Sequence, residues 1–128
     1  MKMHIVPELA PAQGPYCHAV RSGNLLFISG QAPFNKQGEV VGNGMSEQTV
    51  FTLQNLTSVL DHCGLALENV VKTTVYLTNI DEFSAMNTVY ADFFGQHKPA
   101  RATVEAPRLA AGILVEIEAV AEFPQPDA

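Results

Sequence analysis

One arginine and two glutamates in the C-terminal third of the chain are the side chains best suited to chemistry. Arg101 begins the run 101–105, and Glu116 and Glu118 lie in the apolar run 114–123. A guanidinium group binds a small carboxylate through two charge-assisted hydrogen bonds, and a nearby carboxylate can position or deprotonate a water molecule. Together these groups are suited to the hydrolysis of a small substrate that carries a carboxylate.

The alternation of side chains along a strand predicts the direction in which these groups point. In the run 101–105, Arg101 shares one face with Thr103. Ala102 and Val104 share the other face, and we expect this small apolar pair to lie against the core.

The two glutamates of the run 114–123 also share one face, and the opposite face is continuously apolar and suited to packing against helices. If the two strands are neighbours, Arg101 lies on the same face as Glu116 and Glu118, away from the helices. A structural salt bridge between Arg101 and a glutamate at a subunit contact is the alternative interpretation. The strand pattern alone leaves both interpretations open.

The cysteines and histidines are interpreted as neither a metal site nor a nucleophile pair. Cys17 and Cys63 are far apart and follow no CxxC spacing, so we expect reduced thiols. Cys17 and His18 are adjacent, and adjacent strand residues point to opposite faces, which argues against a catalytic pair. The four histidines form no HExxH motif, so we expect no metal site.

Two segments have the apolar periodicity of one-sided helices. The first begins at Ser46, a predicted N-cap with Met45 and Val50 as its hydrophobic staple, and it ends at Gly64. The second helix is predicted over 81–94, with its first residue as the cap.

Strand-like runs surround these helices. They are residues 19–21, 25–29, 70–78, 101–105 and 114–123. Residues 30–44 are rich in Gly, Pro and Asn and are predicted to form a loop or a short edge hairpin. The order of the elements predicts an α+β fold, a two-layer sandwich in which two helices cover one face of a mixed sheet.

The second face of this sheet also needs a cover. Residues 25–28 are apolar at every position, so this strand has no side suited to water. Only two helices are available, and another copy of the chain is the simplest cover. The sequence therefore predicts a homo-oligomer, in which a site between subunits is plausible.

Composition and charge restrict the classes of protein. With 128 residues, 47% of them hydrophobic, we expect a single domain over residues 1–128. No apolar run approaches the length of a membrane span, which is about 18 residues, and no signal peptide begins the chain, so we expect a cytoplasmic protein without a membrane partner. The formal net charge of −6 opposes the phosphate backbone, so nucleic acid is not the expected partner.

Four short motifs then occur in the order of one known family. They are Gly14-Pro15-Tyr16, Ile28-Ser29-Gly30-Gln31, Pro99-Ala100-Arg101 and Val115-Glu116-Ile117-Glu118-Ala119. With them, the chain resembles the RidA (YjgF-type) reactive intermediate deaminase family over about residues 10–122. The resemblance covers nearly the whole chain.

The resemblance implies a chorismate-mutase-like α+β fold and a homotrimer whose sheets close into a central barrel, with three clefts between neighbouring subunits. It implies that Arg101 binds the substrate carboxylate and that Glu116 lies near the attacking water. The other expected substrate-binding residues are Tyr16, Ser29, Gly30, Asn87 and Thr103. The expected reaction hydrolyses 2-iminobutanoate, 2-iminopropanoate and similar 2-imino acids to 2-keto acids and ammonia. We expect it to need no metal and no organic cofactor, because the imine is already electrophilic.

Two departures and three alternatives accompany this expectation. The family often has Cys where this chain has Thr103, and often Gln where it has His18. One alternative is an endoribonuclease or translation inhibitor, which the acidic charge opposes. Another is a non-catalytic ligand-binding or holdase-like module that uses the same cleft. The third is a deaminase of another enamine or imine, such as an aminoacrylate derivative or 2-aminomuconate, with Thr103 and the loop 110–112 tuning the choice.

Overall fold

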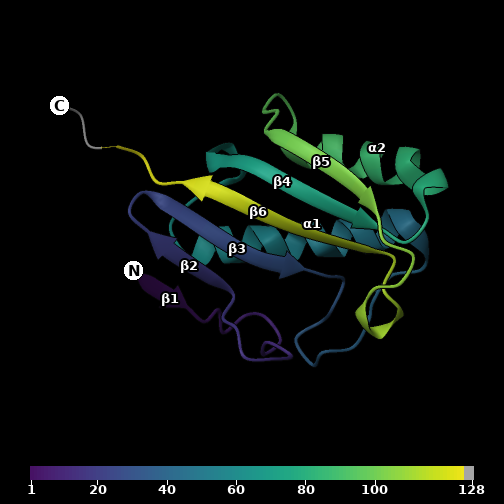
Figure 1. Ribbon diagram of the computed structural model, residues 1–128, viewed down its shortest axis with the longest axis horizontal. Helices are drawn as coiled ribbons and strands as arrows, with labels where there is room; N and C mark the ends of the chain where they lie inside the picture. Colours follow the sequence, from purple (N-terminus) through teal and green to yellow (C-terminus); the bar gives the residue numbers. More distant parts are fainter. Residues whose placement is uncertain (126–128) are drawn as a thin grey trace.

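The computed structural model describes residues 1–125, so the last three residues of the predicted domain lie outside the described residues. Its six strands form one mixed sheet, and two helices cover one face of that sheet (Figure 1). The strands are β1 (Lys2–His4), β2 (Ala19–Ser22), β3 (Leu25–Gln31), β4 (Val70–Leu77), β5 (Ala100–Glu105) and β6 (Val115–Glu122). The helices are α1 (Gly44–His62) and α2 (Phe83–Phe94).

The order of strands across the sheet is β1-β2-β3-β6-β4-β5. Neighbouring strands are antiparallel except β4 and β5, which run parallel and are joined through α2. The helix α1 joins β3 to β4, and β6 lies between these two strands. The predicted α+β fold, with a mixed sheet and both helices on one face, is confirmed.

The first helix begins two residues earlier than its sequence pattern predicts. Asn43 is the N-cap and α1 starts at Gly44, so Met45 lies inside the helix, where it is buried. The Asn43 N–H donates to a carboxylate oxygen of Glu47 at 3.0 Å. The predicted cap at Ser46 is therefore wrong, because the Glu47 side chain already satisfies a free backbone donor at this end.

The second helix is preceded by a 3₁₀ turn over Ile80–Glu82, which the sequence pattern merges with the helix. Asn79 caps this turn, since its side chain accepts the Asp81 N–H at 3.0 Å. Asp81 is therefore not the cap, and α2 starts at Phe83. The C-terminal end is as predicted, because α2 stops before Gly95, whose φ of 59° is in the left-handed region.

The strands agree with the predicted runs to within two residues, with one omission. The three-residue edge strand β1 is too short to show a period, and the sequence pattern does not predict it. The segment 30–44 contains an isolated bridge between Phe34 and Val40, so its prediction as a loop or short hairpin is confirmed.

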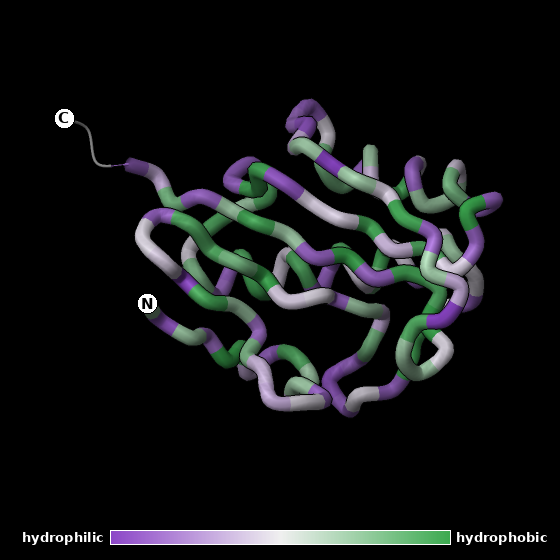
Figure 2. Tube along the Cα trace, viewed as in Figure 1, coloured by the Kyte–Doolittle hydropathy of each residue, from purple (hydrophilic) through white to green (hydrophobic). Residues whose placement is uncertain are grey.

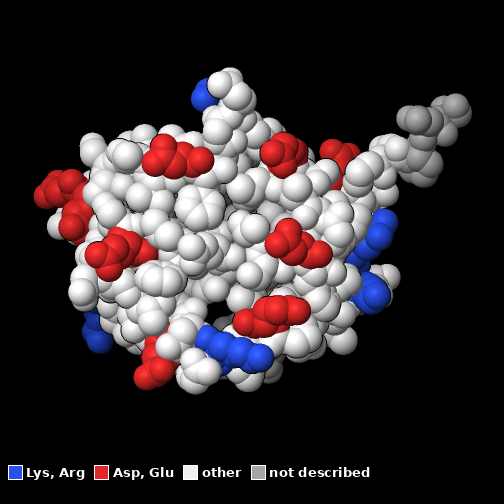
Figure 3. All heavy atoms as spheres, turned by 180° about the vertical axis from the view of Figure 1, so that it is seen from behind, with Lys and Arg blue, Asp and Glu red and all other residues white. Residues whose placement is uncertain are grey.

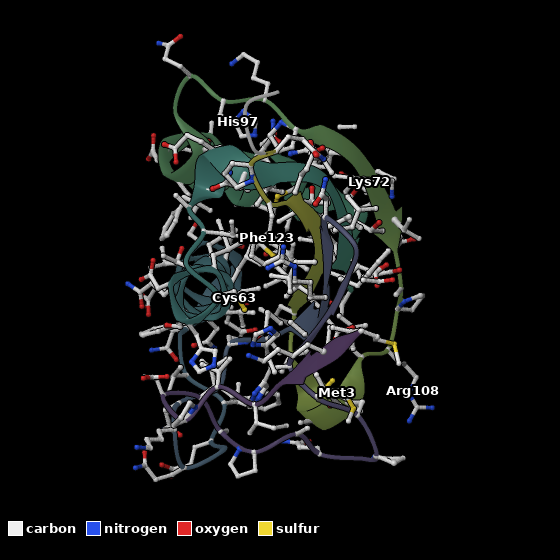
Figure 4. All side chains as sticks on the ribbon, turned by 90° about the vertical axis from the view of Figure 1, so that its left-hand side faces the viewer. Met3, Cys63, Lys72, His97, Arg108 and Phe123 are labelled. Carbon is white, nitrogen blue, oxygen red and sulfur yellow. The ribbon has the colours of Figure 1, made fainter. Side chains whose placement is uncertain are left out.

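The core lies between the sheet and the helix layer, which Figure 4 shows edge-on. Its largest fully buried side chains include Leu26, Leu53, Leu56, Leu77, Met86 and Ile117. In β6, residues 115, 117, 119 and 121 all point into this core, as predicted. Within the described part of the chain, neither helix is long and apolar enough to cross a membrane.

The other face of the sheet is uncovered in one chain. Leu25 and Phe27 of β3 are 37% and 46% exposed, and the tube of Figure 2 shows hydrophobic stretches along the strands of this face. Lys72 of β4 points away from the helices on the same side (Figure 4). Ala102 and Val104 of β5 also face outward, with Val104 43% exposed. The prediction that this apolar pair faces the core is therefore wrong.

Candidate functional site

The first group of predicted site residues meets in a hollow at one end of β3 and β6. Ser29 and Gly30 reach it from β3, Glu116 from β6, and Tyr16 from the segment before β2. Residues 9–13 form a further wall of the hollow. The structure therefore brings four of the predicted residues together in one place.

Glu116 lies directly against the backbone of Gly30. A Cβ atom at position 30 would be 2.9 Å from the Glu116 Cδ atom, which is closer than real side chains approach. The absence of a side chain at Gly30 is thus what lets the Glu116 carboxylate lie across β3. This contact fixes the carboxylate at the floor of the hollow.

Ser29 and Tyr16 flank this carboxylate in different ways. The Ser29 hydroxyl donates to the Cys17 backbone oxygen at 2.7 Å, which ties β3 to the segment before β2. The hydroxyl oxygen keeps lone pairs that can accept a hydrogen bond from a ligand. Tyr16 is 54% exposed, so its ring is available for contact with a ligand or with another subunit.

Two causes raise the pKa of the Glu116 carboxyl above its ordinary value of 4.5. The larger cause is burial, which disfavours the charged form, and the second is the negative charge of Glu118 two residues along the strand. Glu118 itself accepts a hydrogen bond from the Tyr76 hydroxyl at 2.8 Å. A carboxylate with a raised pKa is a better proton acceptor, which suits a general base.

The second group of predicted residues lies between α2 and β5. Arg101 and Asn87 line a shallow hollow there together with Tyr90. The Arg101 guanidinium carbon lies 4.7 Å from the centre of the Tyr90 ring and 5.5 Å from that of Phe83. Stacking on these rings orients the guanidinium and leaves its N–H groups free to bind an anion.

A buried hydrogen bond holds the ring on which Arg101 rests. The hydroxyl oxygens of Thr73 and Tyr90 are 2.7 Å apart, and both residues are buried. Burial raises the pKa of the Tyr90 hydroxyl. This effect is larger than the lowering of the pKa by the Thr73 hydrogen bond and the Arg101 charge, so Tyr90 stays neutral. Neither Tyr90 nor Thr73 is among the predicted site residues, and only the strand register reveals that Thr73 lies beside Arg101.

Thr103 lies two residues beyond Arg101 on β5. It therefore shares the face of Arg101, and it is half-buried opposite Val75 of β4. The predicted grouping of Arg101 with Thr103 is confirmed. Thr103 itself lines neither the hollow around Arg101 nor the hollow around Glu116.

The expectation that Arg101 shares a face with the two glutamates is wrong. Their strands are not neighbours, because β4 lies between β5 and β6. Arg101 is paired with Thr73, and Thr73 is paired with Ala119 of the core-facing side. Glu116 is three residues from Ala119 and therefore points to the opposite face. Within one chain, Arg101 forms a salt bridge with neither glutamate.

Four buried residues of the first hollow were not among the predicted site residues: His18, Gln31, Ala32 and Ile113. His18 is only 6% exposed and lines the hollow, with both ring nitrogens bonded to backbone atoms of the segment before β2. Cys17 instead donates its thiol to the Ala19 backbone oxygen. The prediction that Cys17 and His18 form no catalytic pair is confirmed, but no periodicity signals the role of His18 in the wall.

The described residues also show what the rest of the surface offers. They contain no group of three or more His, Cys, Asp and Glu side chains that is arranged to hold a metal ion. On the helix side of the molecule, acidic groups are spread across the face and basic groups lie towards its edges (Figure 3). That side offers no continuous basic patch for a phosphate backbone.

Comparisons with known proteins agree with the fold. A family model described as Endoribonuclease L-PSP matches residues 7–123. A RutC family protein of Pyrococcus horikoshii is 46% identical over 123 residues, which are 94% of this chain and 98% of that protein. The Escherichia coli 2-iminobutanoate/2-iminopropanoate deaminase is 39% identical, over 94% of this chain and 98% of its own. The crystal structure of E. coli TdcF with bound serine superposes with a TM-score of 0.90 at 31% identity, over 97% of this chain and 100% of that one.

Proposed function

The chain belongs to the Endoribonuclease L-PSP family, also called the YjgF/RidA family, and from this premise we propose that it is an imine deaminase. Its substrates would be 2-iminobutanoate, 2-iminopropanoate and similar 2-imino acids, and its products 2-keto acids and ammonia. The observation that carries this proposal is the Glu116 carboxylate, which is half-buried against Gly30 with its pKa raised by burial. A hydrolase can use such a base to take a proton from water, whereas a binding module does not require a base.

We further propose that the working site lies between subunits of a homotrimer with the chorismate-mutase-like arrangement. The support is twofold: the apolar residues Leu25 and Phe27 are exposed on the open sheet face, and the two groups of site residues are separate within one chain. Arg101 lies on the edge strand β5, so in such an assembly a neighbouring copy packed along this edge would bring its Glu116 group to the Arg101 group. Each subunit would then supply half of every site.

In this site, Arg101 would bind the substrate carboxylate through two N–H groups and so fix the position of the imine carbon. Glu116 of the neighbouring subunit would accept a proton from a water molecule as the water oxygen attacks that carbon. The attack forms a tetrahedral carbinolamine. The attacked imine nitrogen carries a proton from solvent, so return of the water proton from Glu116 to that nitrogen makes it an ammonium leaving group. The C–N bond then breaks as the carbinolamine hydroxyl gives its proton to the Glu116 carboxylate, which leaves ammonia and the keto acid as products.

The remaining site residues would hold the substrate rather than take part in proton transfer. Asn87 and Thr103 stand beside Arg101, while Ser29 and Tyr16 stand beside Glu116. The imine carbon is electrophilic as it stands, so these steps draw only on side chains and water. The serine bound to TdcF supports a small amino-acid-like ligand for this site.

An endoribonuclease activity is the second candidate, because the description of the matching family model favours it. The net charge of −6 and the acidic helix side in Figure 3 oppose RNA binding. A non-catalytic module that binds the same small acids would share the residues around Arg101. Turnover therefore separates the candidates better than binding does.

The test follows ammonia and keto-acid release from freshly generated 2-iminobutanoate, with wild type compared with Arg101→Ala at equal protein concentration. Loss of the two charged hydrogen bonds should lower kcat/KM about a hundredfold. Arg101→Lys, which keeps the charge but not the planar fork, should fall between them. Lys36→Ala, which removes an exposed positive charge that lines neither hollow, is the control. Wild type that folds but does not accelerate release would overturn the proposal.

A further inference from the structure

We propose that His18 is a positioning residue that holds one wall of the Glu116 hollow only while its ring is neutral. The wall is the segment 6–13, which we call the N-terminal strap. Leu9, Ala10 and residues 11–13 of the strap line the hollow opposite Glu116. This inference concerns the same site as the proposed function and rests on it only for its catalytic consequence.

The hydrogen bonds of His18 determine which form of the ring is present. The Val6 N–H donates to Nδ1 of His18 at 2.8 Å, so Nδ1 carries no hydrogen. Nε2 lies 3.0 Å from the Ala10 backbone oxygen, which can only accept, so Nε2 carries the hydrogen. His18 is therefore the neutral Nε2–H tautomer, and its two nitrogens clamp both ends of a five-residue stretch of the strap.

The backbone of His18 connects this clamp to the site itself. The His18 N–H donates to the His4 oxygen of β1, and the His18 oxygen accepts the Ser29 N–H of β3 at 3.0 Å. Ser29 precedes Gly30, against which the Glu116 carboxylate lies. The strap, the edge strand and the floor of the hollow thus meet at one residue, which is almost completely buried.

Protonation of His18 is incompatible with this arrangement. An imidazolium has a hydrogen on Nδ1 as well, and that hydrogen would point at the Val6 N–H across 2.8 Å. The two donors must separate, which frees the Val6 end of the strap and opens the wall. Proton uptake and the closed strap therefore exclude each other, and acid should open the strap.

Several other titratable groups surround His18 and must be separated from it in a test. They are His4 on β1, His62 of α1 in ring contact with His4, Glu8 in the strap, Cys17 and Tyr16 on the same segment, and Glu116 across the hollow. The pKa of His4 is lowered, first by burial and then by the charges of Lys2, His62 and Arg21. The backbone oxygen of His4 accepts the His18 N–H, so His4 is the other histidine hydrogen-bonded to this segment, and His4→Gln is the matched control.

Gln at position 18 supplies the informative variant. Its amide has one oxygen that can accept the Val6 N–H and one NH₂ group that can donate to the Ala10 oxygen. It can thus hold the strap in the same way, but it does not titrate. His18→Gln should keep the wall closed at every pH at which the protein is folded.

The experiment needs no substrate. Nitrogen NMR of the His18 ring reads its tautomer at pH 8, and amide hydrogen exchange reads the protection of Val6 between pH 8 and pH 5, corrected for intrinsic exchange. We expect the Nε2–H tautomer. We also expect Val6 protection to fall as the pH is lowered from 8 to 5 in wild type and in His4→Gln but not in His18→Gln, because only an imidazole can place a hydrogen on the nitrogen that accepts the Val6 N–H. An Nδ1–H tautomer, or the same pH dependence in wild type and His18→Gln, would overturn the proposal.

A catalytic measurement then tests the consequence. The KM for 2-iminobutanoate should rise on the acid side in wild type and stay level in His18→Gln, because only the wild-type wall opens. If neither protein turns the imine over, the proposed function fails while the tautomer and exchange results still decide the clamp. If His18→Gln does not fold, the tautomer and the Val6 exchange in wild type and His4→Gln remain sufficient.

Discussion

Arg101 and Glu116 lie on opposite faces of the same sheet. The register fixes this relationship, since Arg101 pairs with Thr73, Thr73 pairs with Ala119, and Glu116 is an odd number of residues from Ala119. One chain therefore cannot place both side chains on one small substrate. If both are essential, as the proposed function requires, they must come from different chains.

This leads to a complementation prediction. Arg101→Ala and Glu116→Gln should each be inactive alone, but mixing them under conditions of subunit exchange should restore activity. In a randomly mixed trimer, a given site has an intact arginine from one subunit and an intact glutamate from the next in about a quarter of cases. Imine hydrolysis should therefore recover to about a quarter of wild type.

The control is each variant taken through the exchange procedure alone, and mass spectrometry verifies that hybrids have formed. Hybrids without activity would indicate that the two groups act within one chain, and a single variant that stays active alone would indicate that its residue is dispensable. Either result would contradict the inter-subunit site.

A second prediction concerns the charge beside the proposed base. The negative charge of Glu118 contributes to the raised pKa of Glu116, after burial. Glu118→Gln should lower this pKa, so the acid limb of the pH profile of kcat/KM should move to lower pH. The profile is best measured in a His18→Gln background, in which the strap does not titrate. An unmoved acid limb would mean that Glu116 is not the group that must be ionised.

The same raised pKa has a consequence for stability. The folded chain binds a proton at Glu116 more tightly than the unfolded chain does, so this group favours folding below the ordinary pKa of glutamate, and the advantage is lost as the pH rises through the folded-state value. At neutral pH, ionised Glu116 therefore opposes folding. Glu116→Gln should raise the thermal midpoint at pH 7 and have little effect at pH 4, as scanning calorimetry would show.

A third prediction tests the close contact of Gly30 with Glu116. Gly30→Ala places a Cβ atom 2.9 Å from the Glu116 Cδ atom, so the carboxylate must move. A displacement of about 1 Å can lower the rate by about a hundredfold, and we expect a loss of that order in kcat. In a Glu116→Asp background, where the shorter side chain has no Cδ atom, the same substitution should have a much smaller effect. Equal losses in the two backgrounds would point to backbone distortion instead.

A fourth prediction concerns the support under Arg101. Tyr90→Phe keeps the ring but leaves the buried Thr73 hydroxyl without its partner, which should destabilise the protein by about 1–2 kcal/mol. Thr73→Val combined with Tyr90→Phe removes both polar groups and should recover much of this loss. Urea unfolding of the two single variants and the double variant measures the coupling. Additive effects would show that the two hydroxyls do not depend on each other.

Much of the fold was predictable because the information is local. The periodicity of 3.6 residues marks both helices, and the alternation in the run 114–123 correctly places its apolar face against them. The strand order was not predictable, because β6 inserts between β3 and β4, which come much earlier in the chain. Such distant pairings leave no trace in a short window of sequence.

The site was predictable in its residues but not in its geometry. The alternation correctly groups Arg101 with Thr103, yet the rule that apolar residues face the core selects the wrong side of β5. The reason is that Arg101 stacks on the Tyr90 and Phe83 rings, so this charged residue takes the place usually given to an apolar one. The wall held by His18 was also not predictable, since it consists of bonds to backbone atoms.

The central place of β6 also determines when the chain can fold during synthesis. Residues 115–122 leave the ribosome after the other five strands of this sheet, yet they join the β1-β2-β3 half of the sheet to the β4-β5 half. Until they emerge, the nascent chain consists of two half-sheets with open edges at β3 and β4, which are the kind of edges that pair with the wrong partner. The two open edges are therefore paired with each other's half of the sheet only after β6 has been made.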